Sequence, residues 1–352
     1  MNGLDKLLSR DHLPYPGARV GFLGHHASVN KHGEHAVDLL IAKGDWKIVK
    51  LFSPEHGFFG TAAAGEKVEN SLHPHWKIPV HSLYGENRKP SAQDLQGLDV
   101  LVVDLQDLGV RCYTYSSTLY LTMQACADCG IDLIVLDRPT PLSGIVDGPA
   151  LDPALSSFVG MIDLPTVYGK SQGELASFLK QHDSELRKLN LQVFRASETT
   201  PHFSKWIPPS PAITSADAAR LYPLTVWCEA IPQIWVERGT ALSFQVWCMP
   251  DFPPALQAHP PQFHGVTSAA ICCTTPEGDW QGLQFTLDPL HDNHPLQNAL
   301  ILLCALRDEL GHERLFSGTD ARPEFFDKLM GSSSVREMII QGCSALEIIQ
   351  SW

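Results

Sequence analysis

The stretch "LFSPEHGFFG", residues 51–60, places a carboxylate and an imidazole directly after an apolar run. Glu55 and His56 are side chains of the kind that carry out acid–base chemistry. A glutamate near Phe58 and Phe59 is expected to be desolvated, which favours the protonated form that a general acid needs. We therefore interpret Glu55 as a candidate catalytic acid and His56 as a weaker candidate for substrate binding.

A purely structural role for Glu55 is the alternative. Ser53 is a good helix N-cap, Pro54 suits the first helical position, and Glu55 would then lie in the first turn. Gly57 and Gly60 would interrupt such a helix at once. The glycines favour a turn, although the spacing alone leaves both readings of Glu55 open.

A second polar group follows the apolar run "LDVLVVDLQD", residues 98–107. Asp104 and Asp107 end this run, and an arginine and two tyrosines come next, at Arg111, Tyr113 and Tyr115. A metal site is disfavoured because the stretch has no histidine and carries a nearby arginine. We predict a substrate-binding wall, with acceptors for sugar hydroxyls and a cation for an anion. A salt-bridged strand end is the alternative.

Two further motifs have strong structural explanations. Arg138 stands in "LDRP" at the end of another apolar run, where an Asp–Arg pair is often a buried structural ion pair. Ser171 and Glu174 have the S-x-x-E spacing of a capping box at the start of a helix. From the residues alone, both are more easily explained by structure than by catalysis.

The elements that must position these side chains alternate between strand and helix over the first 200 residues. Continuous apolar runs such as 98–107 and 131–139 are typical of parallel strands that are buried on both faces. The pattern predicts a doubly wound parallel sheet, in which ligands bind beyond the carboxyl ends of the strands. The other expected strands are 18–24, 46–52, 78–85 and 191–196, and the expected helices are 34–44, 91–97, 119–129 and 171–182.

A segment rich in Pro, Ser and Thr, residues 199–223, is interpreted as a crossover to a second domain. Strand patterns at 267–275 and 282–287 and an amphipathic helix at 294–310 follow it. We predict two domains, a catalytic one over 1–205 and a smaller α+β one over 206–352.

Composition narrows the classes of function. A net charge of -13 disfavours nucleic-acid or anionic-membrane partners. No apolar run is long enough to span a membrane, and the N-terminus lacks the apolar region of a signal peptide, so a cytoplasmic protein is expected. The nine cysteines are expected to be reduced and mostly buried, including Cys126 and Cys129, for which metal or redox use is the less favoured alternative. No G-x-G-x-x-G motif occurs, so no dinucleotide cofactor is expected.

The order of the motifs resembles the NamZ-type exo-β-N-acetylmuramidases, a bacterial family of glycoside hydrolases. The similarity spans nearly the whole chain and is carried most specifically by PEHG, SLYG, DLQDLG-R-YTY and LDRP. Further matching stretches are "AGEKVENS", "DGPALD", "SSFVG", "YGKSQGELA" and "WIPPSP".

The resemblance implies a Rossmann-like catalytic domain with a smaller α+β domain closing a cleft at the strand ends. The implied activity is release of terminal N-acetylmuramic acid from the non-reducing end of peptidoglycan fragments. The implied catalytic residues are Glu55 and Glu174. For the lactyl carboxylate of muramic acid, which needs a local cation, the candidates are Arg111, Arg138 and Arg238.

The chain departs from the family pattern at three places. Tyr168, which we include among the substrate-binding candidates, stands where relatives have histidine before the "GELA" helix, and Ala212 stands where they have asparagine. The family's "EGTN…EGRGT" stretch is "EAIPQIWVERGT" here, which keeps Glu229 and Arg238 as substrate-binding candidates but lacks the asparagine. The alternative function is therefore a catalytically silent sugar-binding or regulatory protein on the same scaffold.

Overall fold

The structure is a computed structural model that describes residues 1–197, 206–231, 233–318 and 320–352. It forms two compact units. The first consists of Met1–Gly109, Tyr113–Ser143 and Lys170–Pro211, and the second of Val110–Cys112, Gly144–Gly169 and Ala212–Trp352. The expected domain boundary after residue 205 falls at the end of a segment that lies outside the described residues. Residues 199–205 of the expected crossover belong to the same segment.

The first unit is built on a seven-stranded sheet with the order β3-β4-β2-β1-β5-β6-β7. All neighbouring strands are parallel except β3 and β4, which confirms the predicted doubly wound α/β sheet. The interior strand β5 is buried at every position, as its continuous apolar sequence predicts. The strands are β1 (Arg19–Gly24), β2 (Lys47–Ser53), β3 (Ser71–Leu72), β4 (Pro79–Ser82), β5 (Val100–Asp104), β6 (Asp132–Leu136) and β7 (Leu191–Phe194).

The order of the parallel strands reverses direction at the β1–β5 pair. Successive strands are added outward on one side up to β4, and the chain then returns to β5 and continues on the other side. In open α/β sheets this reversal is where ligands bind, outside the carboxyl ends of the strands. A ligand site is therefore expected at the loops after β1 and β5.

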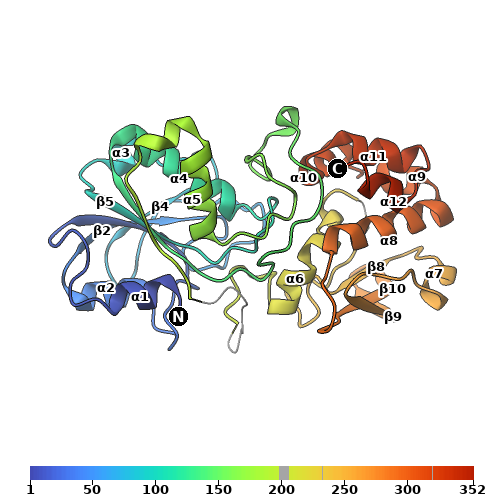
Figure 1. Cartoon of the computed structure of the whole chain (residues 1–352). Helices are drawn as coiled ribbons and strands as arrows, with labels where there is room; N and C mark the ends of the chain where they lie inside the picture. The colour runs from blue at the N-terminus through green and yellow to red at the C-terminus, as the bar shows by residue number, and fades with distance from the viewer. Residues whose placement is uncertain (198–205, 232, 319) are drawn as a thin grey trace. The chain divides into compact units, whose positions relative to one another are not determined.

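Helices cover both faces of this sheet (Figure 1). α1 (Gly3–Leu8) and α2 (Ala36–Lys43) lie on one face, while α3 (Ala92–Leu95), α4 (Tyr115–Cys129) and α5 (Gln172–His182) lie on the other. Gly44 and Gly130 end α2 and α4 in the left-handed conformation, which glycine adopts without steric cost. α4 begins four residues earlier than its apolar pattern indicates.

The second unit contains a three-stranded antiparallel sheet with the order β8-β10-β9. Its strands are β8 (Val246–Met249), β9 (Val266–Thr275) and β10 (Gly278–Leu287), and α6 (Ala216–Thr225) and the long α8 (Pro295–Leu310) pack together beside them. This confirms the smaller α+β domain, although α6 begins inside the segment expected to be a crossover. The remaining elements are η1 (Pro153–Leu155), η2 (Ser184–Lys188), η3 (Val226–Glu229), α7 (Pro254–Ala258), α9 (His312–Phe316), α10 (Pro323–Met330), α11 (Ser333–Ile340) and α12 (Ala345–Ile349).

The cysteines depart from expectation at one pair. Cys248 of β8 and Cys273 of β9 form a disulfide, so the expectation that all nine thiols are reduced is wrong there. The other seven are free. Cys126 is buried in α4 and Cys129 is exposed at its end, with no group of His, Cys, Asp or Glu placed to hold a metal among the described residues.

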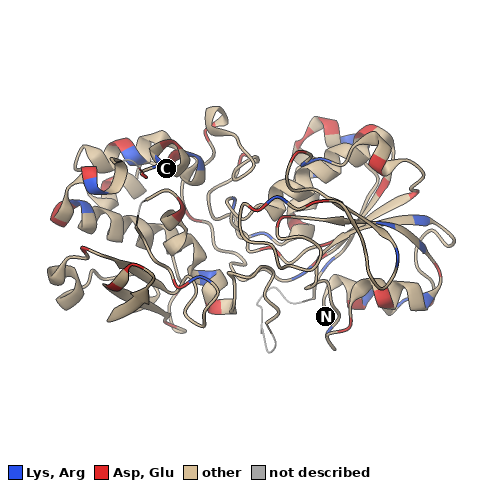
Figure 2. Ribbon diagram, turned by 180° about the vertical axis from the view of Figure 1, so that it is seen from behind, with Lys and Arg blue, Asp and Glu red and all other residues tan. Residues whose placement is uncertain are grey.

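Acidic and basic residues are interspersed on the helices of the first unit (Figure 2). Within the described ranges, no helix has the length and apolar character needed to cross a membrane.

Candidate active site

Glu55 lies on a turn at the carboxyl end of β2 rather than in a helix. Gly57 donates a backbone hydrogen bond to the carbonyl of Pro54 at 3.1 Å, and both His56 and Gly57 have positive φ, at 71° and 77°. A helix cannot continue through two left-handed residues. The turn interpretation is therefore confirmed, and the helix-start alternative for Ser53 is wrong.

The carboxyl group of Glu55 is held at both oxygens. Oε1 accepts a hydrogen bond from the backbone N–H of Gly65 at 2.9 Å, and Oε2 accepts one from the hydroxyl of Thr114 at 2.6 Å. The residue is 8% exposed, so it is desolvated as expected. Of the two aromatic residues expected beside it, Phe58 is buried in the hydrophobic core and Phe59 is half exposed.

His56 fixes the loop that follows the turn. Its ring Nδ1 lies 2.8 Å from the carbonyl oxygen of Ala62, and the N–H of Ala62 donates back to the carbonyl of His56 at 3.2 Å. The ring is buried. A left-handed, non-glycine residue beside a candidate acid is an observed strain of the kind that gathers at functional sites. The contacts give His56 a positioning role for this loop.

The reversal point of the sheet carries two histidines that the sequence did not mark as site residues. His25 follows β1, is fully buried, and accepts a hydrogen bond at Nε2 from the N–H of Gln106, at 3.2 Å. Its proton is then on Nδ1, which lies 3.3 Å from the carbonyl of Pro209. Burial is the main reason that the pKa of His25 lies well below its ordinary value, and the neighbouring His26 and Arg138 lower it further. His25 is therefore neutral at pH 7.

His26 packs directly against the Glu55 turn. Gly60 leaves room for its ring, since a Cβ there would lie only 1.9 Å from the imidazole. Nε2 is 2.7 Å from the carbonyl of Pro208, while Nδ1 is buried with no partner among the described residues. Burial lowers the pKa of His26, against the opposing effect of the Pro208 contact. A neutral histidine with an unused nitrogen thus lies beside the turn.

Two predicted tyrosines join this group from the start of α4. The hydroxyl of Tyr115 donates to the carbonyl of Pro209 at 3.0 Å and approaches the carbonyl of Glu55 at 3.4 Å. The rings of Tyr113 and Tyr115 are 4.7 Å apart. Burial raises the pKa of both phenols, so both stay protonated. The motif "WIPPSP" reaches the site through the carbonyls of Pro208 and Pro209.

The contacts of Asp104 and Arg138 are those of a structural ion pair. The guanidinium of Arg138 forms a two-pronged ion pair with Asp104, and its Nη2 also donates to the carbonyl of Val29 at 2.8 Å. Asp104 is fully buried and Arg138 is 7% exposed. The pair ties the ends of β5 and β6 to the loop after β1. This is the salt-bridged strand end that was the alternative for Asp104.

Asp107 is also buried and accepts a hydrogen bond from the side-chain amide of Gln172 at 2.9 Å. Asp137 at the end of β6 accepts one from the N–H of Gly173 at 2.8 Å. The start of α5 is therefore anchored at the carboxyl edge of the sheet, the same edge that carries Glu55.

Glu174 forms the predicted capping box. Its Oε2 accepts from the N–H of Ser171 at 2.9 Å, and its own N–H donates to the hydroxyl of Ser171 at 3.2 Å. Three strand spacings separate β2 from β6, which amounts to about 14 Å across the sheet. The geometry accounts for the cap at Glu174, while its catalytic role stays a prediction.

Four predicted site residues belong to the second unit. Arg111 is buried and donates to the carbonyls of Leu164 and Met330, at 2.7 and 2.6 Å, and to the hydroxyl of Thr166 at 2.8 Å. Tyr168 is buried in the same unit. The contacts of Arg111 are those of an arginine that joins segments of a fold.

Glu229 and Arg238 pair with each other at 2.7 Å. The side chain of Arg238 is 37% exposed and also lies 3.5 Å from the sulfur of Cys228. The guanidinium of Arg322 donates to the backbone carbonyl of Glu229. Among the three arginines considered for anion binding, Arg238 has the largest exposed fraction.

Comparison with known proteins agrees with this architecture. Family models described as the N-terminal and C-terminal domains of exo-β-N-acetylmuramidase NamZ match residues 20–217 and 220–352. The peptidoglycan β-N-acetylmuramidase NamZ of Bacillus subtilis is 31% identical over 99% of this chain and 86% of its own length.

Solved structures of similar proteins agree with this family match. Two crystal structures of DUF1343 family proteins from Bacteroides fragilis are each 28% identical to the chain. One has a TM-score of 0.85 and covers 96% of this chain and 90% of its own, and the other has a TM-score of 0.76 and covers 100% and 94%. The chain belongs to the NamZ family of exo-β-N-acetylmuramidases.

Proposed function

We propose that this protein is an exo-acting glycosidase that releases N-acetylmuramic acid from the non-reducing end of peptidoglycan fragments. The observation that carries the proposal is the setting of Glu55, a desolvated carboxyl on a strained turn at the carboxyl edge of the sheet, held by two donors. Membership of the family supplies the substrate class.

In the proposed reaction Glu55 gives its proton to the glycosidic oxygen while the bond from that oxygen to the anomeric carbon breaks. Water then adds to the anomeric carbon and gives one proton to a carboxylate of the site, so that the sugar is released as a hemiacetal. Gly65 and Thr114 each occupy one lone-pair direction of the carboxyl oxygens, and each oxygen retains a second one for the proton. These contacts fix where the proton is delivered.

Glycosidases of this kind use a second carboxylate, and we propose Glu174 for that role. Its position at the carboxyl edge of the sheet supports the assignment, and the capping box would orient the side chain without excluding catalysis. The two side chains would have to reach toward each other from strands about 14 Å apart to the roughly 5–9.5 Å that glycosidase carboxyl groups keep. Asp107, Tyr113 and Tyr115 would border the sugar, beside the loop that His56 fixes.

We assign the lactyl carboxylate of muramic acid to Arg238. The assignment is supported by its exposure, whereas Arg138 is engaged by Asp104 and Arg111 by carbonyl groups. An arginine binds a carboxylate through two parallel hydrogen bonds. Glu229 would orient the guanidinium, and Tyr168 stays a predicted contact in the same unit.

We also propose that the protein acts in the cytoplasm, in recycling of wall fragments, without nucleic-acid or membrane partners. Seven free cysteines are typical of a reducing compartment, with the Cys248–Cys273 pair as the exception. The net charge of -13 opposes binding to phosphate-rich partners. Fractionation of cells that express the intact gene tests the location.

The activity is tested with a panel of chromogenic β-glycosides that differ only in the sugar. We expect release from the N-acetylmuramide, slower or no release from the N-acetylglucosaminide, and loss of release in Glu55→Gln. Binding of the muramide without any turnover would contradict the proposal and identify a silent sugar-binding protein.

A further inference from the structure

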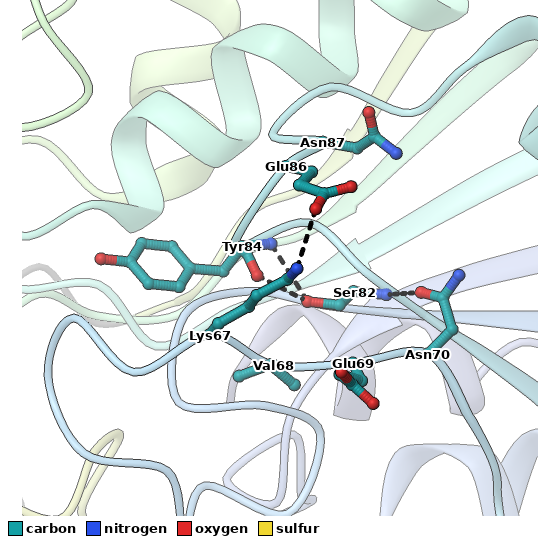
Figure 3. Close-up of a pocket in the computed structure, with 8 residues that line it drawn as sticks. All are labelled: Lys67, Val68, Glu69, Asn70, Ser82, Tyr84, Glu86 and Asn87. Atoms are coloured by element: carbon teal, nitrogen blue, oxygen red, sulfur yellow. Dashed lines mark hydrogen bonds and ion pairs between the residues drawn. The ribbon is translucent and has the colours of Figure 1, made fainter.

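A polar pocket borders the Glu55 turn in the first unit. It has a volume of about 320 Å³, at the lower end of the range of roughly 300–1,000 Å³ found for ligand sites. Figure 3 shows the side chains that surround it. The lining residues are Lys67, Val68, Glu69, Asn70, Ser82, Tyr84, Glu86 and Asn87.

Both walls of the pocket are attached to the segment that carries Glu55. One wall, residues 67–70, follows Gly65, whose N–H donates to the Glu55 carboxylate. In the same wall, Val68 lies against Gly57, where a Cβ would meet it at 3.4 Å. The other wall follows β4, where the N–H of Leu83 donates to the carbonyl of Ser53 at 2.8 Å.

The two walls are also bonded to each other. The N–H of Ser82 donates to the side-chain oxygen of Asn70 at 2.8 Å, and Lys67 pairs with Glu86 at 2.9 Å (Figure 3). The ring of Tyr84 points away from this ion pair in the figure, so Tyr84 contributes mainly backbone to the pocket. The pocket is therefore formed by contacts within the protein itself.

The lining chemistry suits a neutral polar ligand. Glu86 balances the charge of Lys67, and Glu69 leaves the pocket with a net negative charge. A ligand carboxylate, such as those of muramic acid or of a peptide stem, is repelled by such a surface. The Ser82 hydroxyl is engaged by the backbone of Tyr84, and the Asn70 oxygen by the N–H of Ser82. The NH₂ group of Asn70 and the side-chain amide of Asn87 can instead pair with the hydroxyl and acetamido groups of an amino sugar.

We infer that this pocket is the subsite for the neutral amino sugar on the leaving-group side of the scissile bond, an N-acetylglucosamine residue. The inference rests on the proposed function and extends it to the part of the substrate that departs. It also assigns a role to the "AGEKVENS" and "SLYGEN" stretches, which form the two walls. Binding there would place the leaving oxygen next to the Glu55 turn.

The test compares two substrates with the same muramic acid and different leaving groups. One is N-acetylmuramyl-β-1,4-N-acetylglucosamine and the other is an aryl N-acetylmuramide. We expect Asn87→Ala and Lys67→Met each to lower kcat/KM for the disaccharide about 3- to 10-fold, mainly through KM, by loss of a hydrogen bond. The aryl muramide should change less than about twofold, because its leaving group makes no such bonds.

Lys47→Met is the matched control, because Lys47 is an exposed lysine at the opposite, amino edge of the sheet. It should leave both substrates unchanged. Free N-acetylglucosamine should inhibit wild type and inhibit Asn87→Ala more weakly.

Equal losses on both substrates, or none on either, would overturn the inference. A selective loss that appears only with a peptide-bearing substrate would overturn it as well and identify a peptide site. Absence of turnover by wild type on both substrates would instead refute the proposed function.

Discussion

Thr114 donates a 2.6 Å hydrogen bond to Oε2 of Glu55, joining residues 59 positions apart in the chain. Thr114 is the N-cap residue of α4, yet its side chain makes no capping hydrogen bond to that helix. A threonine cap normally satisfies one of the free N–H groups of the first turn and is worth about 1 kcal/mol. The fold uses this hydroxyl to hold the candidate acid instead.

Glu55→Gln should lower kcat on a natural sugar leaving group by about 10²–10⁴, the usual contribution of general acid catalysis. Substrates with very acidic leaving groups should lose less, because they depart without protonation. The melting temperature should change little. The amide keeps an oxygen for Gly65, and the Thr114 hydroxyl can turn to accept from the new NH₂ group. Steady-state kinetics and thermal unfolding of the purified variant check both parts.

Two companion variants separate chemistry from stability. Glu55→Ala leaves the buried Thr114 hydroxyl without a partner and should cost about 1–3 kcal/mol for that group, besides the activity. Gly65 is exposed, so its N–H can bond to water instead. Thr114→Ser keeps the hydroxyl and should keep most of the activity, while Thr114→Val should lose it in part. Near-normal turnover by Glu55→Gln on a sugar leaving group would show that Glu55 is structural.

Arg238→Met should raise KM for muramides about 10- to 150-fold, which corresponds to about 1.5–3 kcal/mol for a lost hydrogen bond to a charged group. Glucosaminides lack the lactyl carboxylate and should be nearly unaffected. Stability should fall by less than about 1 kcal/mol, since the Glu229–Arg238 pair is partly exposed. Inhibition of the wild type and of Arg238→Met by free N-acetylmuramic acid and by N-acetylglucosamine gives a second measurement of how each sugar binds. Equal losses on both substrate classes would contradict the assignment.

The Asp104–Arg138 pair should behave as a unit. Arg138→Met or Asp104→Leu alone should cost about 3–5 kcal/mol, because each leaves an unpaired buried charge. The double variant should recover much of that loss, although the carbonyl of Val29 still loses its donor. Urea unfolding of the four proteins gives the coupling energy. Additive losses would mean that the two side chains act independently.

Stability should decrease as the pH falls below about 6.5. The pKa of His25 is well below its ordinary value in the folded protein, so in this range the unfolded chain takes up a proton that the folded protein does not. The stabilisation that His25 contributes is complete above the pKa of histidine in the unfolded chain. It is lost as the pH falls toward the pKa of His25 in the folded protein. The slope from one such histidine is about 1.4 kcal/mol per pH unit.

His25→Gln removes the group that takes up this proton. The slope of unfolding free energy against pH should therefore fall by about 1.4 kcal/mol per pH unit between pH 6.5 and 5. Denaturant unfolding at several pH values measures this slope. The glutamine oxygen can still accept from the N–H of Gln106. His32→Gln, at an exposed loop residue, is the control and should leave the slope unchanged. An unchanged slope in His25→Gln would show that other groups carry the pH dependence.

The sequence was sufficient for elements whose signal is local. β5 was predicted because a strand buried on both faces needs an unbroken apolar run, and it runs from Val100 to Asp104. The capping box of Glu174 was predicted because its partners lie three residues apart. The turn at Glu55 was predicted because two glycines so close together do not continue a helix.

Elements that depend on distant partners were missed or misplaced. α4 begins with Tyr115, Ser116 and Ser117, which are weak helix formers, and their burial overrides that preference. β3 has only two residues, and pairing with β4 is what makes it a strand. His25 and His26 were missed as site residues, because nothing local indicates that Pro208 and Pro209 would reach them.

The sequence by itself therefore determined the α/β sheet, the family and the turn that carries Glu55, since each follows from periodicity, glycine placement or a contiguous motif. Only the tertiary structure decided what each charged side chain does. Asp104 and Arg138 became a buried ion pair, and Glu55 gained Thr114 as a donor. The physical reason is that a charge takes its role from its nearest partner and from its burial, and both are set by residues far away in the chain.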